Sequence, residues 1–251
     1  MATRISTLSR APSADWIAEH RRAWERKPAL RSVYTRWFKR LRDACVPEGA
    51  IVELGCGAGF FKETYPEILA TDVVENPYAD RIVDATSLPF SDQEVGNILM
   101  IDVFHHLPGP ERFVREVARV LRPSGRLIMI EPWIGFAGRI LWTYLHHEDC
   151  DLSVRPGAPW GSGQKDPMMG NAALPYLYFR PGGHLETMGL PLRVIRRDPF
   201  TALPWLLSGG FQPLSLLPSF LAGTAEMVDR VLSLAPSLTA TRCLVTVERT
   251  A

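Results

Sequence analysis

Residues 51–59 read Ile51-Val52-Glu53-Leu54-Gly55-Cys56-Gly57-Ala58-Gly59, and this stretch decides the fold. Its apolar residues predict a short buried strand, and three glycines follow at alternate positions. Glycines at the end of a strand let the backbone turn with φ > 0, and they let a ligand reach main-chain N–H groups without meeting a Cβ atom. The stretch therefore predicts a nucleotide-like cofactor over a strand-to-helix turn.

The acid in this stretch, Glu53, helps to distinguish between two cofactors. The dinucleotide pattern G-x-G-x-x-G holds a pyrophosphate at a helix N-terminus, and its third glycine comes one residue later than Gly59 does here. An acid before the first glycine opposes a pyrophosphate but suits an ammonium group. S-adenosylmethionine carries an α-ammonium and a sulfonium and has no phosphate, so the pattern favours it over NAD.

A second acid, Asp72, ends the next apolar segment, residues 68–72. Its carboxylate can accept hydrogen bonds from both ribose hydroxyls of either cofactor, so the residue type does not discriminate. Asp72 follows the glycines more closely than the spacing of about 20 residues in dinucleotide folds. The helix between them must be short and end at Pro66, and Glu75 is the alternative ribose ligand.

The segments after Asp72 follow a recognisable order. Asp84-Ala85 precedes a near-continuous apolar strand, residues 98–101, and the pattern D-x-x-H-H-L begins at Asp102. A helix is expected over 110–121, a turn over 122–125 within L-R-P-x-G-x-L, and a central strand over 126–132 that ends in E-P. Together with the glycine stretch, this order resembles the class I S-adenosylmethionine-dependent methyltransferases, in their type 11 branch, over about residues 48–132.

The resemblance implies an α/β fold of Rossmann-like, doubly wound type. We expect a seven-stranded, mostly parallel sheet with its last strand antiparallel, N-terminal helices and an inserted cap. The cofactor is expected to be S-adenosyl-L-methionine. The implied cofactor-binding residues are Glu53, Gly55, Cys56, Gly57, Gly59, Asp72, Asp84, Ala85 and Ile101.

Methyl transfer to a hydroxyl or phenol needs a base, and histidine is the usual one near neutral pH. His105 is our preferred base because it follows the fourth strand, where the methyl group projects in this fold. His106 is the second candidate, although it is often structural in the family, and Asp102 orients the base or contacts the cofactor. A carbon acceptor would need no strong base. In the cap, His147, Glu148 and Asn171 are the expected acceptor-binding residues.

The chain divides into five expected parts. They are a disordered tail (1–12), N-terminal helices that act as a lid (13–46), the cofactor-binding core (47–132), a cap over the acceptor (133–192) and the C-terminal strands that complete the sheet (193–251). The helix near residues 28–42 has an apolar face and a basic face. The basic face is read as solvated surface, or alternatively as a contact for RNA, anionic membrane or an acidic substrate.

Residues 199–225 contain no charged side chain and many Leu, Trp and Phe residues. They form either a buried crossover or an apolar rim for a hydrophobic or lipid-linked acceptor. The net charge of +1 gives no strong overall attraction to nucleic acid, and no apolar run is long enough for a transmembrane helix. Four separated cysteines argue against a zinc site or a disulfide framework, so no metal and a cytoplasmic location are expected.

The sequence thus predicts a methyltransferase for a small-molecule acceptor, with O-methylation of a glycan, a lipid-linked compound or a secondary metabolite as the leading reading. Three alternatives remain. They are an RNA methyltransferase that uses the basic helix, a non-catalytic partner protein with the same fold, and an NAD-dependent oxidoreductase. Nucleic acid is the less expected partner, peripheral contact with a membrane is compatible with the pattern, and the oligomeric state is left open.

Overall fold

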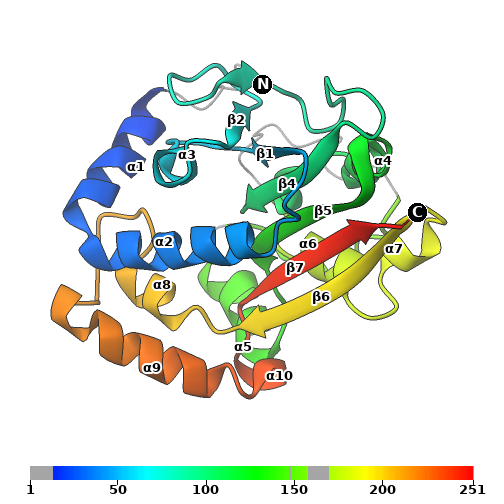
Figure 1. The fold of residues 1–251 in the computed structure, drawn as a ribbon. Coiled ribbons are helices and arrows are strands. Elements are labelled where there is room, and N and C mark those ends of the chain that lie inside the picture. The colour runs from blue at the N-terminus through cyan, green and yellow to red at the C-terminus, as the bar shows by residue number, and fades with distance from the viewer. Residues whose placement is uncertain (1–13, 147, 158–169, 251) are drawn as a thin grey trace, which may run out of the picture.

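The computed structural model describes residues 14–146, 148–157 and 170–250. Seven strands form one sheet in the order β3-β2-β1-β4-β5-β7-β6 (Figure 1). Strand β7 runs antiparallel to both of its neighbours, and the other pairings are parallel, so the predicted sheet is confirmed. The strands are β1 (Ala50–Leu54), β2 (Leu69–Asp72), β3 (Arg81–Ile82), β4 (Val95–Ile101), β5 (Leu121–Pro132), β6 (Leu192–Phe200) and β7 (Arg242–Arg249).

Helices cover both faces of this sheet (Figure 1). The helices that precede β5 in the chain are α1 (Ala14–Arg26), α2 (Pro28–Asp43), α3 (Phe60–Thr64), the 3-10 turn η1 (Phe104–His106) and α4 (Pro110–Val120). The later ones are α5 (Phe136–Ile140), the π-turn η2 (Leu141–Leu145), α6 (Leu174–Phe179), α7 (His184–Thr187), α8 (Leu203–Ser208), η3 (Ser219–Leu221), α9 (Ala222–Leu232) and α10 (Pro236–Thr239). No helix in the described part of the chain is both long enough and apolar enough to span a membrane.

Alternate residues of the central strands enter two separate apolar clusters. In β4, Ile98 and Met100 pack with Phe113 of α4 and Tyr178 of α6, whereas Leu99 packs with α2 on the other face. Successive side chains of a strand point to opposite faces, so a strand that is apolar at every position must be covered on both sides. This explains why the near-continuous apolar run of β4 lies at the centre of a doubly wound sheet.

The local predictions differ from the structure in a few places. The expected turn at 122–125 lies inside β5, where the ladder to β4 skips from Leu121 to Arg126 and Ser124 has φ +64°. Part of the expected cap, α6, packs its Tyr178 and Phe179 into the core beneath the sheet. Strand β3 has only two residues and was not predicted. The expected tail, residues 1–12, lies outside the described residues.

The basic side chains of the N-terminal helices are largely paired with acids, most of which lie on other elements of the fold. Ion pairs join Arg21 to Glu63, Arg36 to Glu226, Lys39 to Asp43, Arg40 to Asp198 and Arg42 to Glu67. Exposed pairs of this kind contribute little to stability, but they remove free positive charge from the surface. The pairing favours the solvated-surface reading of this helix over a nucleic-acid contact.

Lys27, between α1 and α2, holds the segment that follows α8. Its ammonium donates hydrogen bonds to the carbonyls of Ser208 (2.8 Å), Gly210 (3.0 Å) and Leu214 (3.0 Å), and it also contacts the carbonyl of Gln212. The segment bends around the ammonium at Gly209, which has φ +68°. A Cβ atom at Gly209 would lie 2.2 Å from the Leu214 carbonyl oxygen, so the bend requires glycine.

We expect Lys27→Met to lower the free energy of unfolding by about 3 kcal/mol, because four carbonyls would lose a charged donor. Lys39→Met is the matched control, since Lys39 is exposed and pairs with Asp43 one helical turn away; its effect on stability should be much smaller than that of Lys27→Met. Urea unfolding followed by circular dichroism measures both. Equal losses in the two variants would contradict this role for Lys27.

Candidate functional site

Four neighbouring strands carry an acid where they end, at the carboxyl edge of the sheet. In sheet order, Asp72 ends β2, Glu53 lies near the end of β1, Asp102 follows β4 and Glu131 lies near the end of β5. The first two and Glu131 are buried, and Asp102 is partly exposed. Buried carboxylates need partners, because losing water disfavours their charged form.

Two of these carboxylates are satisfied mainly by backbone donors. Asp72 accepts a hydrogen bond from the Gly57 N–H at 2.9 Å, which fixes the glycine turn. Glu131 accepts from the N–H groups of Val103 (2.8 Å) and Phe104 (2.7 Å), and its other oxygen lies 2.6 Å from Nδ1 of His105. These bonds hold the turn after β4 against the end of β5.

Asp102 is balanced by a side chain from β7. The buried guanidinium of Arg242 donates to it, and three tryptophans surround that guanidinium: Trp205 at 4.1 Å, Trp37 at 5.1 Å and Trp142 at 5.6 Å from ring centre to Cζ. Asp102 has φ +56°, an uncommon value for a residue other than glycine. The ion pair therefore holds Asp102 in a conformation that the backbone alone disfavours.

Glu53 is the carboxylate without such a partner. Its Oε2 is buried and makes no hydrogen bond with any residue that the structure describes. Burial, reinforced by the charge of Asp72, raises the pKa of Glu53 to about 8. Such a shift corresponds to roughly 5 kcal/mol against the charged form. A cation bound at this point would relieve that cost, so the site favours an ammonium or a sulfonium group.

The glycine turn after β1 leaves room for such a ligand. Gly55 has φ +72°, and a Cβ atom there would lie 2.5 Å from a methyl group of Val103. Gly57 has φ +52°, and a Cβ atom there would lie 3.3 Å from the ring of Trp16 of α1. Main-chain atoms are therefore exposed to the space between the turn and α1, as the sequence predicts.

A cavity of about 370 Å³ lies over this turn. Six of its aromatic side chains come from the N-terminal helices, from α3 and from the segment held by Lys27: Trp16, Tyr34, Phe38, Phe60, Phe61 and Phe211. His20 of α1 stacks on Phe211 at 4.1 Å, and burial lowers the pKa of His20 to about 4. The roof is thus aromatic and uncharged, and the acids lie on the floor.

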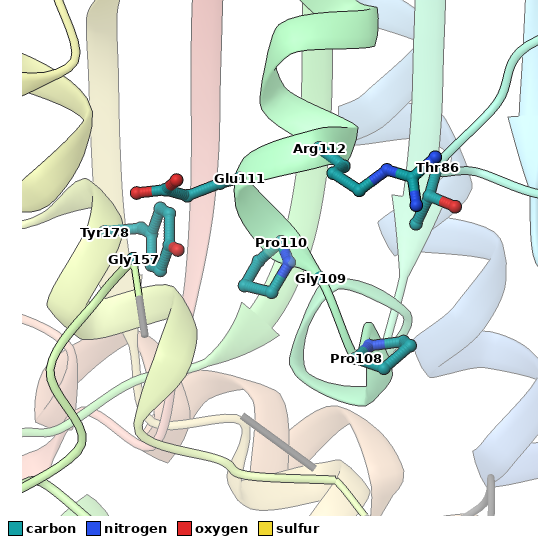
Figure 2. A pocket seen from close by; sticks show the side chains of 8 residues that line it. All are labelled: Thr86, Pro108, Gly109, Pro110, Glu111, Arg112, Gly157 and Tyr178. Carbon is teal, nitrogen blue, oxygen red and sulfur yellow. The ribbon is translucent and has the colours of Figure 1, made fainter. Parts of the chain in front are cut away.

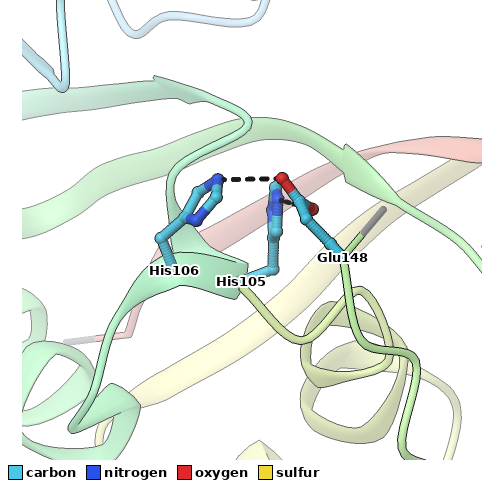
Figure 3. A group of neighbouring side chains, drawn as sticks. All are labelled: His105, His106 and Glu148. Atoms are coloured by element: carbon cyan, nitrogen blue, oxygen red, sulfur yellow. Dashed lines mark ion pairs between the residues drawn. The ribbon is translucent and has the colours of Figure 1, made fainter. Parts of the chain in front are cut away.

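On the floor, His105, Glu148 and His106 form one connected group (Figure 3). Nε2 of His105 lies 3.1 Å from Glu148, and Nε2 of His106 lies 3.7 Å from the other oxygen of Glu148. Burial alone would lower the pKa of His105, but Glu131 and Glu148 on its two sides raise it well above 6.5. His105 is therefore an imidazolium with both ring nitrogens engaged, and its side chain is 3% exposed.

His106 has the opposite character. It lines the cavity, and burial together with the positive charge of His105 lowers its pKa to about 4. Its Nδ1 is buried without a hydrogen-bond partner among the described residues. Glu148 also lines the cavity, and His105 keeps the pKa of this carboxyl low despite burial. A neutral imidazole and a carboxylate thus lie side by side at the cavity wall.

The structure brings together most of the residues that the sequence singles out. The predicted residues that line the cavity are Glu53, Gly55, Cys56, Gly57, Ile101, Asp102, His106 and Glu148. Asp72 and Gly59 support the turn from behind, and His105 supports Glu148. Asp84 is exposed, lies next to Ala85, and accepts from the Thr86 N–H at 2.7 Å. Asn171 hydrogen-bonds to the backbone of residues 151 and 173, and His147 lies outside the described residues.

Sequence reasoning missed several residues of this site. They are Trp16, His20, Lys27, Phe211, Gln212, Glu131 and Arg242. Glu131 could have been found from the E-P pair that ends its strand, since the other strands that end at this edge also carry acids. Lys27 and Arg242 gave no local signal, because each finds its partners more than a hundred residues away.

A second cavity, of about 390 Å³, lies between the start of α4 and α6 (Figure 2). Thr86, Glu111, Arg112 and Tyr178 are among its lining residues. Glu111 is already paired with His184 at 2.5 Å, and Thr86 belongs to the loop that Asp84 holds. Its lining within the described chain therefore offers no unbalanced acid like Glu53.

Comparison with known proteins agrees with this geometry. The model of a family described as "Methyltransferase domain", type 11, matches residues 52–129. A probable S-adenosylmethionine-dependent methyltransferase of Mycobacterium tuberculosis, MT3114, is 31% identical over 109 residues, which are 38% of this chain and 39% of that protein. Probable tRNA methyltransferase 9B of Mus musculus is 32% identical over 100 residues, 35% of this chain and 22% of that protein.

The chain thus spans well under two thirds of the length of these curated relatives. Among solved structures, the [4+2]-cyclase SpnF has a TM-score of 0.52 at 17% identity, over 86% of this chain and 81% of that one, which agrees with the fold. The family match lies on the strands and turns that build the cavity floor. Residues 52–129 therefore match the type 11 family of the class I S-adenosylmethionine-dependent methyltransferases.

Proposed function

We propose that this chain transfers a methyl group from S-adenosylmethionine to an uncharged, largely apolar small molecule. The observation that carries the proposal is the buried, unbalanced Glu53 beside the glycine turn. Because one protein of this fold is a cyclase, the fold alone does not carry it. A cytoplasmic location is part of the proposal, supported by four cysteines that are all free thiols.

The residues on the cavity floor fit the cofactor. Glu53 would accept the α-ammonium, and main-chain groups of Gly55 and Gly57 would lie against the ligand. Asp72 stays the candidate for the ribose hydroxyls, and Asp84 and Ala85 stay the candidates for the adenine. When bound, S-adenosylmethionine supplies the methyl group on a positively charged sulfur, which the acidic floor also favours.

The cavity wall supports an acceptor that is apolar and uncharged. Aromatic rings dominate the roof, and an aromatic or aliphatic acceptor would bury its surface against them. No arginine or lysine is among the described residues that line the cavity, so an anionic acceptor would find no cationic side chain there. A phenol, an alcohol on a lipid or a secondary metabolite fits this lining better than a charged sugar does.

For a hydroxyl acceptor, we assign the base to His106 rather than to His105. His106 is neutral and reaches the cavity, whereas His105 is buried, already protonated and engaged on both sides. With the cofactor bound, a ring nitrogen of His106 would take the hydroxyl proton of the acceptor as the methyl group is transferred to its oxygen. Glu148 then stabilises the resulting imidazolium, and His105 acts as a positioning residue that holds Glu148.

An RNA acceptor is the second candidate, because one relative is named as a probable tRNA methyltransferase. The basic side chains of the N-terminal helices are largely paired with acids, which weighs against it. Measured RNA binding whose affinity falls steeply with salt would support this candidate instead.

Glu53→Gln tests the cofactor site through two effects of opposite sign. We expect the affinity for S-adenosylmethionine to fall at least tenfold in calorimetric titration, because the ammonium loses its carboxylate. Without ligand, the variant should be more stable than the parent above pH 8, where folding must hold Glu53 charged. The gain should vanish below about pH 4, where the group is protonated in both states. Glu63→Gln is the control, since the Glu63 side chain is 48% exposed and pairs with Arg21 at the surface; it should change both quantities little.

The protonation states of the two histidines can be read without an acceptor. In a pH titration followed by NMR of ¹⁵N-labelled imidazoles, His105 should remain protonated past pH 8, and His106 should remain neutral down to about pH 5. Glu131→Gln should lower the pKa of His105, because Glu131 raises that pKa more than Glu148 does. Ordinary titration of both rings near pH 6.5 would contradict the assignment.

Turnover is tested by release of S-adenosylhomocysteine with a panel of phenols and long-chain alcohols, and with carboxylates as the anionic comparison. We expect release with uncharged acceptors and His106→Gln to reduce turnover about 10²–10⁴-fold, with unchanged cofactor affinity. His184→Gln is the matched control, since His184 pairs with Glu111 outside the cofactor cavity. If His106→Gln is as active as this control, His106 is not the base.

A further inference from the structure

Most of the large apolar side chains that are exposed in the described residues fall within two segments, 136–145 and 214–238. We call the exposed apolar side chains of these two segments the apolar surface. Among them, Phe220 is 84% exposed, Leu234 82% and Tyr144 77%. Single exposed apolar residues are ordinary, but a concentration of them marks an interaction site.

The exposure pattern of helix α9 is the reverse of that of an ordinary surface helix. Its Met227 and Val231 face solvent, whereas its acids face the protein. Glu226 pairs with Arg36 of α2 at 2.5 Å, and Asp229 accepts a hydrogen bond from the Leu203 N–H at the start of α8. A helix on the surface of a globular protein normally places its apolar side inward and its charges outward. An apolar phase over the outer side would account for the inverted arrangement.

The two segments adjoin each other at one end of the molecule. Helix α10, which follows α9, packs on α5, and α9, α10 and α5 lie together along the lower edge in Figure 1. Both segments also run directly into the lining of the cofactor cavity. Phe211 and Gln212 line the cavity, and Leu214 and Leu216, which follow them in the chain, are exposed. In the other segment Leu145 is exposed, and Glu148, three residues later, lines the cavity.

We propose that the apolar surface docks on a phospholipid membrane of neutral headgroups, and that the acceptor reaches the cavity from that membrane. The inference rests on the proposed function only in making the lipid phase the source of the acceptor. Docking itself would follow from burial of the exposed apolar side chains in the interfacial region, where such side chains leave water. Tyr144 suits this depth, because tyrosine is enriched at membrane–water interfaces.

The charges favour a membrane over a protein partner. Within the two segments the charged residues are Arg139, Glu226, Asp229 and Arg230, and the two acids are used inside the fold. A specific protein interface fixes its register with hydrogen bonds and complementary charges around an apolar centre. This surface offers few of either, and it offers no basic cluster for anionic lipid. Docking on a fluid membrane of neutral lipids needs no fixed hydrogen bonds and no complementary charges.

The test is co-sedimentation of the full chain with phosphatidylcholine vesicles. We expect wild-type protein to sediment with the vesicles, with little change between 0.1 M and 1 M NaCl. Phe220→Ser should lower the ratio of bound to free protein at least fivefold. The matched control is Ile82→Ser in β3, which removes a side chain that is 60% exposed and outside both segments; its ratio should stay within twofold of wild type.

Several outcomes would overturn the proposal. They are failure of the wild type to sediment, equal losses in the two variants, binding only to phosphatidylserine vesicles that salt abolishes, and a lipid-free dimer in light scattering that Phe220→Ser dissociates. The last result would assign the surface to a second copy of the chain. Titration of each variant with S-adenosylmethionine keeps the two proposals separate. Normal cofactor binding without vesicle binding rejects only the membrane, and the reverse rejects only the cofactor.

Discussion

Repulsion among the carboxylates at the carboxyl edge of the sheet is the constraint on which the rest of the site depends. Parallel strands that end side by side bring Asp72, Glu53, Asp102 and Glu131 to one edge. Three of these carboxylates have partners that stabilise their charge. Asp72 accepts from a backbone N–H, Asp102 pairs with Arg242, and Glu131 accepts from backbone N–H groups and contacts His105. Glu53 has no such partner, and its raised pKa indicates that a cation would be favoured at this point.

The roof of the cavity depends on a different interaction. Helix α1 and the segment after α8 come from opposite ends of the chain, and Lys27 joins them by donating to carbonyls of residues 208–214. The stacking of His20 on Phe211 continues the same contact above the cavity. Closure of the site and exposure of Leu214 and Leu216 are therefore two consequences of one anchored segment, which connects the cofactor cavity to the apolar surface.

The sequence predicted what depends on local pattern. The glycine turn, Glu53 and the order of the central strands are encoded within a few residues of one another, and the structure confirms the turn and the strand order. The partners of Asp102 and of residues 208–214 could not be predicted, because Arg242 and Lys27 lie far away in the chain. The different surroundings of His105 and His106 could not be predicted either, since the 3-10 turn sends one ring toward Glu131 and brings the other to the cavity. The uncharged segment 199–225 turned out to contain both buried and exposed parts, with Leu217 buried and Phe220 exposed.

The most direct test of the central claim is calorimetric titration of the protein with S-adenosylmethionine near pH 7, repeated in two buffers of different ionisation enthalpy, with NADH as the comparison. The account predicts micromolar binding of S-adenosylmethionine with release of a proton, since Glu53 is mainly protonated in the free protein and must charge against the ammonium. It predicts no binding of NADH, whose pyrophosphate the acid opposes. Binding of NADH, or no binding of S-adenosylmethionine, would contradict it.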